Sequence, residues 1–175
     1  MFHLFHPRRP GPVFVCSLDE AGDISRRLRA GLLVSISDPE RRTITQVRLG
    51  KMRASICPLD FHDIERPAPD MTAPESHHIN TAISALRRVP AHRPVLVHCH
   101  AGISRSSATA LVLATARQLH AGKAPAEAVS DAFSQVSAAT PHARPNMRII
   151  EIGATALELS NTNFVQSAWD LHRSS

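Results

Sequence analysis

The sequence predicts an α/β protein of three layers, in which a central, mostly parallel sheet of four to five strands is flanked by helices. Short apolar runs alternate with helical patterns along the chain. One run, Val95–His98, lacks polar alternation, as is typical of a strand buried on both faces. A glycine-containing turn leads from it into a predicted helix, Ser104–Ala121, that is apolar nearly all round. We expect this helix to lie centrally against the sheet.

Further strands are expected at Val13–Cys16, Leu32–Ser37 and Met52–Pro58. In the third run, one face carries the apolar residues Met52, Ala54 and Ile56. The segment Ile44–Leu49 alternates only weakly, so both a strand and a loop stay open there.

Helices are predicted between the strands from apolar spacing and capping residues. The first covers Asp19–Arg29, with Ser17 or Asp19 as N-cap and Gly31 as its end. Pro90 ends the second, and Gly122 ends the central helix. Beyond the first and the central helix, the expected ranges are His77–Val89, Ala126–Ser137 after Pro125, and about Asn146–Leu159.

The length of 175 residues suggests one domain, with a body at 12–160, an N-terminal tail at 1–11 and a C-terminal tail at 161–175. Apolar residues make up 43%, which is enough for a packed core. The formal net charge of +5 favours anionic partners. Dedicated nucleic-acid binding is disfavoured, because no dense basic run has interleaved aromatic residues.

The three cysteines have no paired spacing, which argues against a disulfide framework. We expect Cys16 and Cys57 to be buried apolar residues, with one alternative open: a protective disulfide between Cys57 and an oxidised Cys99. No apolar segment suits a signal peptide or a membrane span. We therefore expect a cytoplasmic protein without a membrane span.

The chemistry centres on H-C-H-A-G-I-S-R-S, residues 98–106. A turn that contains Gly102 allows backbone N–H groups to converge on one centre, and the start of a helix adds further N–H groups and its dipole. Arg105 supplies a planar cation suited to two oxygens of a phosphate. We expect the oxyanion to bind to residues 100–105, namely His100, Ala101, Gly102, Ile103, Ser104 and Arg105.

The same positive field favours the thiolate form of Cys99, which makes it a nucleophile beneath the bound phosphorus. Attack would give a phosphocysteine intermediate that water later hydrolyses. Ser106 is placed to hydrogen-bond the sulfur as it leaves, and His98 to order the loop. A metal or other cofactor is not expected, because Arg105 would repel a cation at this site.

This segment resembles the signature loop of the cysteine-dependent protein tyrosine phosphatases, Cys-x5-Arg with His before it and Ser after it. The similarity extends from about Leu32 to about Leu159 and is greatest to compact dual-specificity-like domains, among them short bacterial members. It implies their fold, protein-tyrosine-phosphatase activity, and a phosphorylated protein or a small phosphomonoester as substrate. It also implies a general acid, an aspartate on a loop upstream of the signature.

Residues 59–76 contain three prolines and five acidic residues, and we expect most of this stretch to be a loop. It offers Asp60, Asp63 and Asp70 as general acids. Asp63 is favoured, because F-H-D-I follows the predicted strand as in the short bacterial group. Asn146 either braces the signature loop or caps the last helix.

Three other interpretations stay open. In the first, the substrate is a phosphoinositide or nucleotide rather than a protein. In the second, the chain is a rhodanese-like sulfurtransferase, and in the third it is an inactive phosphate-binding module. A sulfurtransferase would need no upstream acid and usually lacks this His-Cys-x5-Arg-Ser pattern. The intact Cys99 and Arg105 argue against an inactive module. The oligomeric state is not predicted by the sequence.

Overall fold

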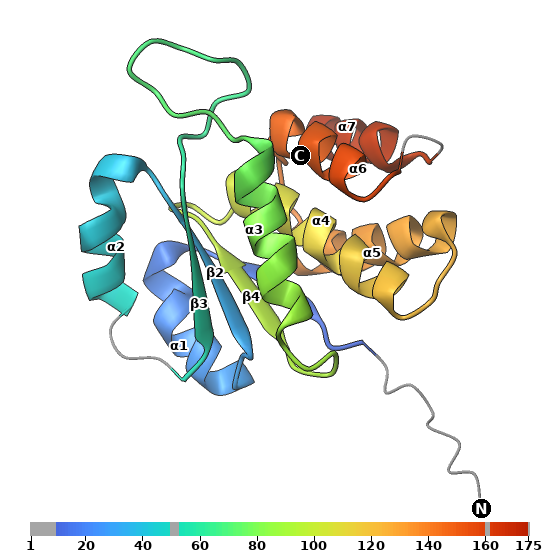
Figure 1. Cartoon of the computed structure of the whole chain (residues 1–175), viewed down its shortest axis with the longest axis horizontal. Helices are drawn as coiled ribbons and strands as arrows, with labels where there is room; N and C mark the ends of the chain where they lie inside the picture. The colour runs from blue at the N-terminus through green and yellow to red at the C-terminus, as the bar shows by residue number, and fades with distance from the viewer. Residues whose placement is uncertain (1–9, 50–52, 160–161, 175) are drawn as a thin grey trace, which may run out of the picture.

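The computed structural model describes residues 10–49, 53–159 and 162–174. A four-stranded parallel sheet in the order β1-β4-β2-β3 lies between two layers of helices (Figure 1). This architecture confirms the predicted three-layer α/β fold. The strands are β1 (Val13–Cys16), β2 (Leu32–Ser37), β3 (Ser55–Asp60) and β4 (Val95–His98). The helices are α1 (Leu18–Leu28), the 3₁₀ helix η1 (Pro39–Arg41), α2 (Arg42–Leu49), α3 (Ser76–Arg87), α4 (Arg105–His120), α5 (Pro125–Ala139), α6 (Met147–Ala156) and α7 (Phe164–Ser174).

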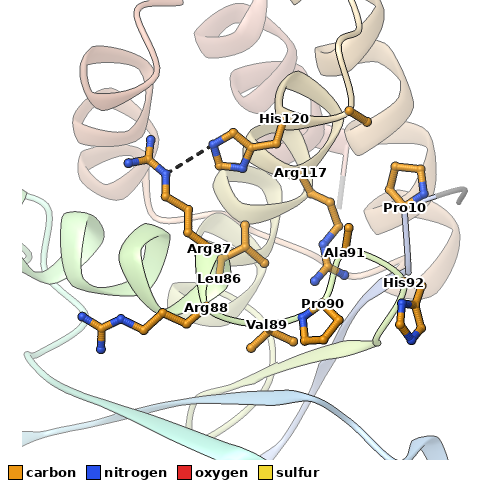
Figure 2. Close-up of a pocket in the computed structure, with 11 residues that line it drawn as sticks. Pro10, Leu86, Arg87, Arg88, Val89, Pro90, Ala91, His92, Arg117 and His120 are labelled. Carbon is orange, nitrogen blue, oxygen red and sulfur yellow. Dashed lines mark hydrogen bonds between the residues drawn. The ribbon is translucent and has the colours of Figure 1, made fainter. Parts of the chain in front are cut away.

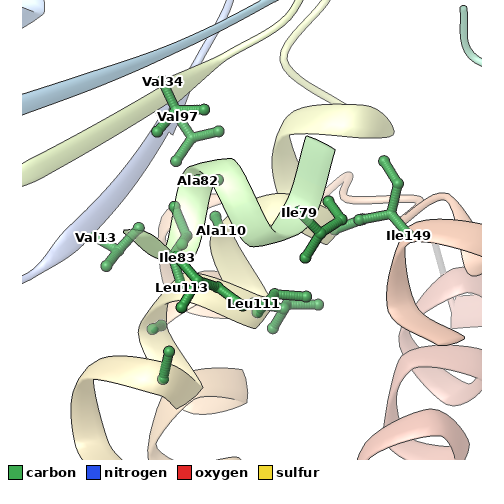
Figure 3. Packing of buried hydrophobic residues seen from close by; sticks show 14 of the residues in the cluster. Val13, Val34, Ile79, Ala82, Ile83, Val97, Ala110, Leu111, Leu113 and Ile149 are labelled. Carbon is green, nitrogen blue, oxygen red and sulfur yellow. The ribbon is translucent and has the colours of Figure 1, made fainter. Parts of the chain in front are cut away.

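The larger core lies between one face of the sheet and helices α3 and α4 (Figure 3). Every residue of α4 from Arg105 through Arg117 is buried, as its nearly all-apolar sequence predicts. Leu111 and Leu113 are fully buried, and burial of such a side chain contributes about 1.5–3 kcal/mol. The opposite face packs on α1 through a smaller cluster that includes Leu33 and Leu96. Because α4 is enclosed on all sides, its first turn is held rigidly at the edge of the sheet.

All four strands are parallel, so their carboxyl ends meet at one edge of the sheet. Cys16 lies in register with His98, and Ser37 with Asp60. The long loop at 61–75 extends from this same edge (Figure 1). Ligands of such sheets bind outside the carboxyl ends of the strands. The parallel order of the strands therefore brings together the signature loop, residues 99–106, and the loop at 61–75, which we call the acidic loop.

The end of α1 differs from the expectation. Arg29, not Gly31, adopts the left-handed conformation that terminates the helix, with φ of 48°, and its N–H bonds to the carbonyls of Arg26 and Ser25. Gly31 is needed for a different reason. A Cβ at this position would lie 2.6 Å from Cγ1 of Val89, so the glycine permits close packing beside α3.

The segment 44–49, predicted as a strand or a loop, is instead part of α2. Pro39 starts the preceding η1 turn, and α2 then packs against α1. The β-branched residues Ile44, Thr45 and Val47 have weak helix propensity, and tertiary packing overrides it. The alternation seen in the sequence was therefore misleading.

Strand β3 is present, but its buried face is the opposite of the predicted one. Cys57 and Leu59 are buried, whereas Ile56 is 44% exposed. Met52 lies outside the described residues. Because successive side chains on a strand point to opposite faces, a wrong choice of parity inverts the whole assignment. At this edge strand, apolar residues occupy both faces, so the pattern alone did not decide.

The remaining helices agree with the prediction to within a few residues. The range 161–175, expected as a tail, contains α7, whose Phe164 and Ala168 are fully buried against the core formed with α5 and α6. Among the described residues, no helix has the length and apolar character to cross a membrane.

Candidate active site

Cys99 lies directly after β4 and is 3% exposed, at the base of the signature loop. The loop turns through Gly102, whose φ is +78°, and α4 begins at Arg105. A Cβ on residue 102 would lie 2.8 Å from the backbone carbonyl carbon of Cys16. Glycine is therefore required twice, by the positive φ and by the close approach of β1.

Two hydrogen-bonding groups contact the sulfur of Cys99. The hydroxyl of Ser106 lies 3.1 Å from Sγ, and the backbone N–H of Gly102 donates to Sγ at 3.3 Å. Ser106 is fully buried. Hydrogen bonds to a sulfur favour its anionic form, which is the nucleophile and also the leaving group of a thiophosphate.

The carbonyl groups of the loop are turned away from its centre by other segments. The N–H of Leu18 donates to the carbonyl of His100, and the N–H of Arg144 to that of Ile103, both at 3.1 Å. The N–H of Asn146 donates to the carbonyl of Ser104 at 3.4 Å. By contrast, the backbone N–H groups of residues 100, 101 and 103–105 meet no acceptor in the described part of the chain. Unpaired N–H groups at a helix start form an anion-binding site.

Arg105 is only 5% exposed, and one corner of its guanidinium is fixed. Its Nη1 donates to Oδ1 of Asp38 and to the carbonyl of Phe61, both at 2.7 Å. Nε is buried and has no hydrogen-bond partner among the described residues. The Nε–Nη2 edge is thus left for two oxygens of a bound oxyanion. Beside it, a cavity of about 270 Å³ is lined by Leu18, Ile36, Ser37, Asp38, Arg41, Thr45, His100 and Arg105.

Asp38 is a residue of the site that the sequence reasoning missed. It follows β2, which pairs directly with β4, and so it emerges next to Cys99 at the carboxyl edge of the sheet. An acidic residue directly after a strand that neighbours the nucleophile strand is a signal that would have found it. The ion pair with Asp38 at 2.7 Å gives the buried guanidinium of Arg105 its nearest counter-charge.

Of the three aspartates considered as general acids, the structure places only Asp63 over the loop. Its Oδ1 accepts from the hydroxyl of Ser104 at 2.8 Å, and its Oδ2 lies 4.0 Å from Nε of Arg105. Asp60 instead contacts the hydroxyl of Ser37 and the guanidinium of Arg42, on the side of α2. Asp70 lies on the exposed part of the loop, with φ of 59°.

Of the two roles considered for the side chain of Asn146, the structure shows the helix cap, and its second contact is with the acidic loop rather than with the signature loop. Its Oδ1 accepts from the N–H of Ile149 at 3.2 Å as the N-cap of α6, and its Nδ2 donates to Oδ1 of Asp63 at 2.9 Å. Glu65 accepts from the N–H of Met147 at 2.8 Å. The start of α6 therefore anchors the acidic loop above the signature loop.

The acidic loop is also closed at its own base by His62. The N–H of His62 donates to the carbonyl of Thr72, and the N–H of Thr72 donates to Nδ1 of His62. Phe61, the only aromatic residue of the loop, is fully buried and stacks at a tilt on His78. Phe61 is thus unavailable as an exposed clamp for an aromatic substrate.

His98 is fully buried, and its Nδ1 lies 3.2 Å from the carbonyl of Cys99. Burial lowers the pKa of His98, so the ring is neutral at neutral pH. Its Nε2 has no partner among the described residues. These contacts suit the expected role of ordering the loop and not that of carrying a proton.

All three cysteines are unpaired and buried. Burial raises the pKa of Cys16 to about 12 and that of Cys57 to about 11. Cys57 is in register with Val34 of β2, which is in register with Val97 of β4, so two strand spacings separate it from the strand that delivers Cys99. That is about 10 Å and exceeds the Cα distance that a disulfide spans. The proposed Cys57–Cys99 disulfide is incompatible with this arrangement.

Within the described residues, no group of three or more His, Cys, Asp and Glu is placed to hold a metal ion.

Comparison with known families supports the signature. A family model described as protein-tyrosine phosphatase matches residues 67–148, just under half of the chain. The matched segment includes Cys99, Arg105 and Asn146 and begins after Asp63. It supports the cysteine-dependent protein tyrosine phosphatase superfamily. No curated protein sequence matches the chain.

Solved structures share the fold at low identity. Human tyrosine phosphatase-like serine/threonine/tyrosine-interacting protein is 16% identical, with 84% of this chain and 91% of that chain covered and a TM-score of 0.57. Human DUSP28 is 22% identical, with 93% and 95% covered and a TM-score of 0.53. PTPMT1, solved in complex with PI(5)P, is 15% identical, with 94% and 95% covered and a TM-score of 0.52.

Proposed function

We propose that the chain is a phosphomonoester hydrolase that uses Cys99 as nucleophile, Arg105 and the loop amides as phosphate ligands, and Asp63 as general acid and base. The observation that carries this proposal is the position of one thiol. Cys99 opens a loop in which the N–H groups of residues 100, 101 and 103–105 meet no acceptor within the described ranges, and it lies beside the Ser106 hydroxyl and near a guanidinium with one open edge. The family match over residues 67–148 supports the same reaction class.

In the first step, the sulfur of Cys99 attacks phosphorus. The P–S bond forms as the P–O bond to the leaving group breaks, and the proton of Asp63 passes to the leaving oxygen. Oδ1 of Asp63 is held by Ser104 and Asn146, so Oδ2 is the oxygen left to carry this proton. The amides and Arg105 hold the three remaining oxygens of the phosphoryl group while its charge redistributes.

In the second step, water attacks the phosphocysteine. Asp63, now a carboxylate, takes a proton from the water, and the P–S bond breaks to release the thiolate and inorganic phosphate. The hydroxyl of Ser106, 3.1 Å from the sulfur, donates to the thiolate as it leaves. The same carboxyl group thus serves as acid and then as base, which restores the starting state.

The reaction is tested with p-nitrophenyl phosphate in EDTA-containing buffer. Wild-type protein should turn over the substrate, and vanadate, which mimics the five-coordinate phosphorus, should inhibit it. Cys99→Ser should lose activity. Cys57→Ser is the matched control, because it makes the same replacement at a buried cysteine two strands away. If Cys99→Ser kept the wild-type rate, the proposed mechanism would be wrong.

Two other activities have distinct outcomes in the same preparation. Transfer of sulfur from thiosulfate to cyanide, without phosphate release, would identify a sulfurtransferase. Vanadate binding without turnover of any phosphomonoester would identify an inactive phosphate-binding module.

The finer part of the proposal is hydrolysis of phosphotyrosine in a protein, and it follows from the resemblance of the signature loop. Phosphotyrosine peptides should have a higher kcat/KM than phosphoserine peptides, phosphoinositides or nucleotides. A preference for a phosphoinositide or nucleotide would instead assign a non-protein substrate to the same site.

A further inference from the structure

A second cavity, of about 810 Å³, lies at the opposite edge of the sheet from Cys99 (Figure 2). It is formed where α3 ends, where the chain runs into β4, and where α4 ends. Figure 2 shows Arg87 and His120 in direct contact through a hydrogen bond at its wall, with Arg117 nearby. Its size is in the range of cavities that hold small organic ligands. The lining residues are Pro10, Leu86, Arg87, Arg88, Val89, Pro90, Ala91, His92, Arg117, His120 and Ala121.

The lining is cationic and contains no carboxylate. The Nε of Arg87 donates to Nε2 of His120 at 3.3 Å, so the ring accepts a hydrogen bond and does not neutralise the guanidinium. Burial and the charge of Arg87 lower the pKa of His120, which agrees with a neutral ring at neutral pH. Among the described residues, no carboxylate therefore pairs with Arg87 at the cavity.

Arg117 adds a second cation, and this one is 5% exposed. Its Nη1 donates to the carbonyls of Gly11 and Arg93, at 2.8 and 2.9 Å, and so ties together the segments that lead into β1 and β4. Among the described residues, its buried Nη2 has no hydrogen-bond partner, carboxylates included. A buried guanidinium without a counter-ion is electrostatically costly. An anion in the cavity would supply the missing charge.

Apart from Arg88 and His92, the remaining lining residues are apolar, namely Leu86, Val89, Pro90, Pro10, Ala91 and Ala121. We propose that this cavity binds an organic anion, namely a molecule with an apolar body and a phosphate-type or phosphonate-type headgroup placed beside the hydrogen-bonded pair Arg87 and His120, on the side of Arg117. Inorganic phosphate alone would use the cations but leave the apolar walls empty. A neutral molecule would do the reverse.

The proposal is tested with 2-naphthylmethylphosphonate, which has both features and is not hydrolysed. In ¹⁵N-labelled full-length protein, it should shift the amide resonances of residues 86–92 and 117–121. This response is separable from any response at residues 99–106, the signature loop. Inorganic phosphate should bind the cavity more weakly, and 2-naphthylmethanol, which has the same body without charge, should not saturate it.

Arg87→Gln should weaken phosphonate binding at residues 117–121 about tenfold or more, as expected for the loss of a charged hydrogen-bond donor. Arg87 is exposed, so the variant should fold normally. Arg27→Gln is the matched control, because it removes the same charge from an exposed position on α1, across the sheet. The proposal is overturned if the neutral alcohol binds as tightly as the phosphonate, if residues 86–92 and 117–121 do not respond, or if both variants bind equally well.

Discussion

Replacing Asp63 with asparagine should remove proton transfer and leave the rest of the site in place. Asparagine has nearly the shape of aspartate, and its Oδ1 can accept the same two hydrogen bonds, from Ser104 at 2.8 Å and from Asn146 at 2.9 Å. The lost attraction to Arg105 acts over 4.0 Å from a side chain that is 39% exposed, so solvent screening limits it to about 0–1 kcal/mol. We therefore expect the variant to fold, with a small change in its free energy of unfolding.

The effect on turnover should be far larger. General acid catalysis contributes about 10²–10⁴-fold, which corresponds to about 3–5 kcal/mol of transition-state stabilisation. The assay compares kcat/KM for p-nitrophenyl phosphate and for phenyl phosphate, because kcat/KM reports the first step, whereas loss of the base in the second step affects both substrates equally. Because p-nitrophenolate leaves readily without a proton, Asp63→Asn should slow phenyl phosphate hydrolysis much more than p-nitrophenyl phosphate hydrolysis.

Asp60→Asn is the control for this experiment. Asp60 contacts Ser37 and Arg42 and not the signature loop, so its replacement should affect both substrates equally and only slightly. The assignment fails if Asp63→Asn retains the wild-type rate on phenyl phosphate. It also fails if Asp60→Asn is the variant whose loss depends on the leaving group.

Three further outcomes are expected. Ser106→Ala removes the hydroxyl that lies 3.1 Å from the sulfur of Cys99, so breakdown of the phosphocysteine should slow about 10-fold or more. Rapid-quench kinetics should then show a burst of p-nitrophenol. A slower steady state without a burst would instead place the role of Ser106 in the first step. Gly102→Ala combines a φ of +78° with a Cβ that would lie 2.8 Å from the backbone of β1. It should lower Tm much more than Gly122→Ala, where φ is +86° and nothing lies within 4 Å of the added Cβ, so that only backbone strain of about 1–2 kcal/mol applies. Equal losses of Tm would contradict this reasoning. Burial lowers the pKa of His98 in the folded state, so the unfolded state takes up the proton first and the protein loses stability as the pH falls below about 6.5. Urea midpoints at pH 7.5 and pH 5.5 should therefore differ less in His98→Gln than in the wild type. An unchanged difference would argue that other groups control the response to acid.

The strand, turn and helix start that form the candidate site could be predicted from the sequence, because each depends on a local pattern. A run of four buried strand residues, a glycine turn and a helix start are local features. They predicted that Cys99 follows a strand, that Gly102 lies in the turn and that Arg105 lies at the start of the helix, as the structure has them. The apolar character of the central helix likewise predicted its burial. These features depend on neighbours in the chain, so periodicity and capping are enough to find them.

The contacts of Asp38 and Asn146 depend on strand order and helix docking, which no local pattern contains. Asp38 reaches Arg105 only because β2 lies beside β4, and Asn146 reaches Asp63 only because α6 packs near the carboxyl edge of the sheet. The face of β3 was misjudged for the same kind of reason, since apolar residues occupy both of its faces and only packing shows that Cys57 is inside.

By itself, the sequence predicted the α/β class, a candidate nucleophile with its arginine and a short list of candidate acids, because each of these depends on spacing along the chain. The tertiary structure alone distinguished among the aspartates: it directs Asp60 toward α2 and brings Asp63 over the signature loop. It also produced the cationic cavity at the far edge of the sheet, where Arg87 and Arg117 come from different helices. Residues far apart in sequence meet only when helices and strands pack, and that packing is decided by the whole core.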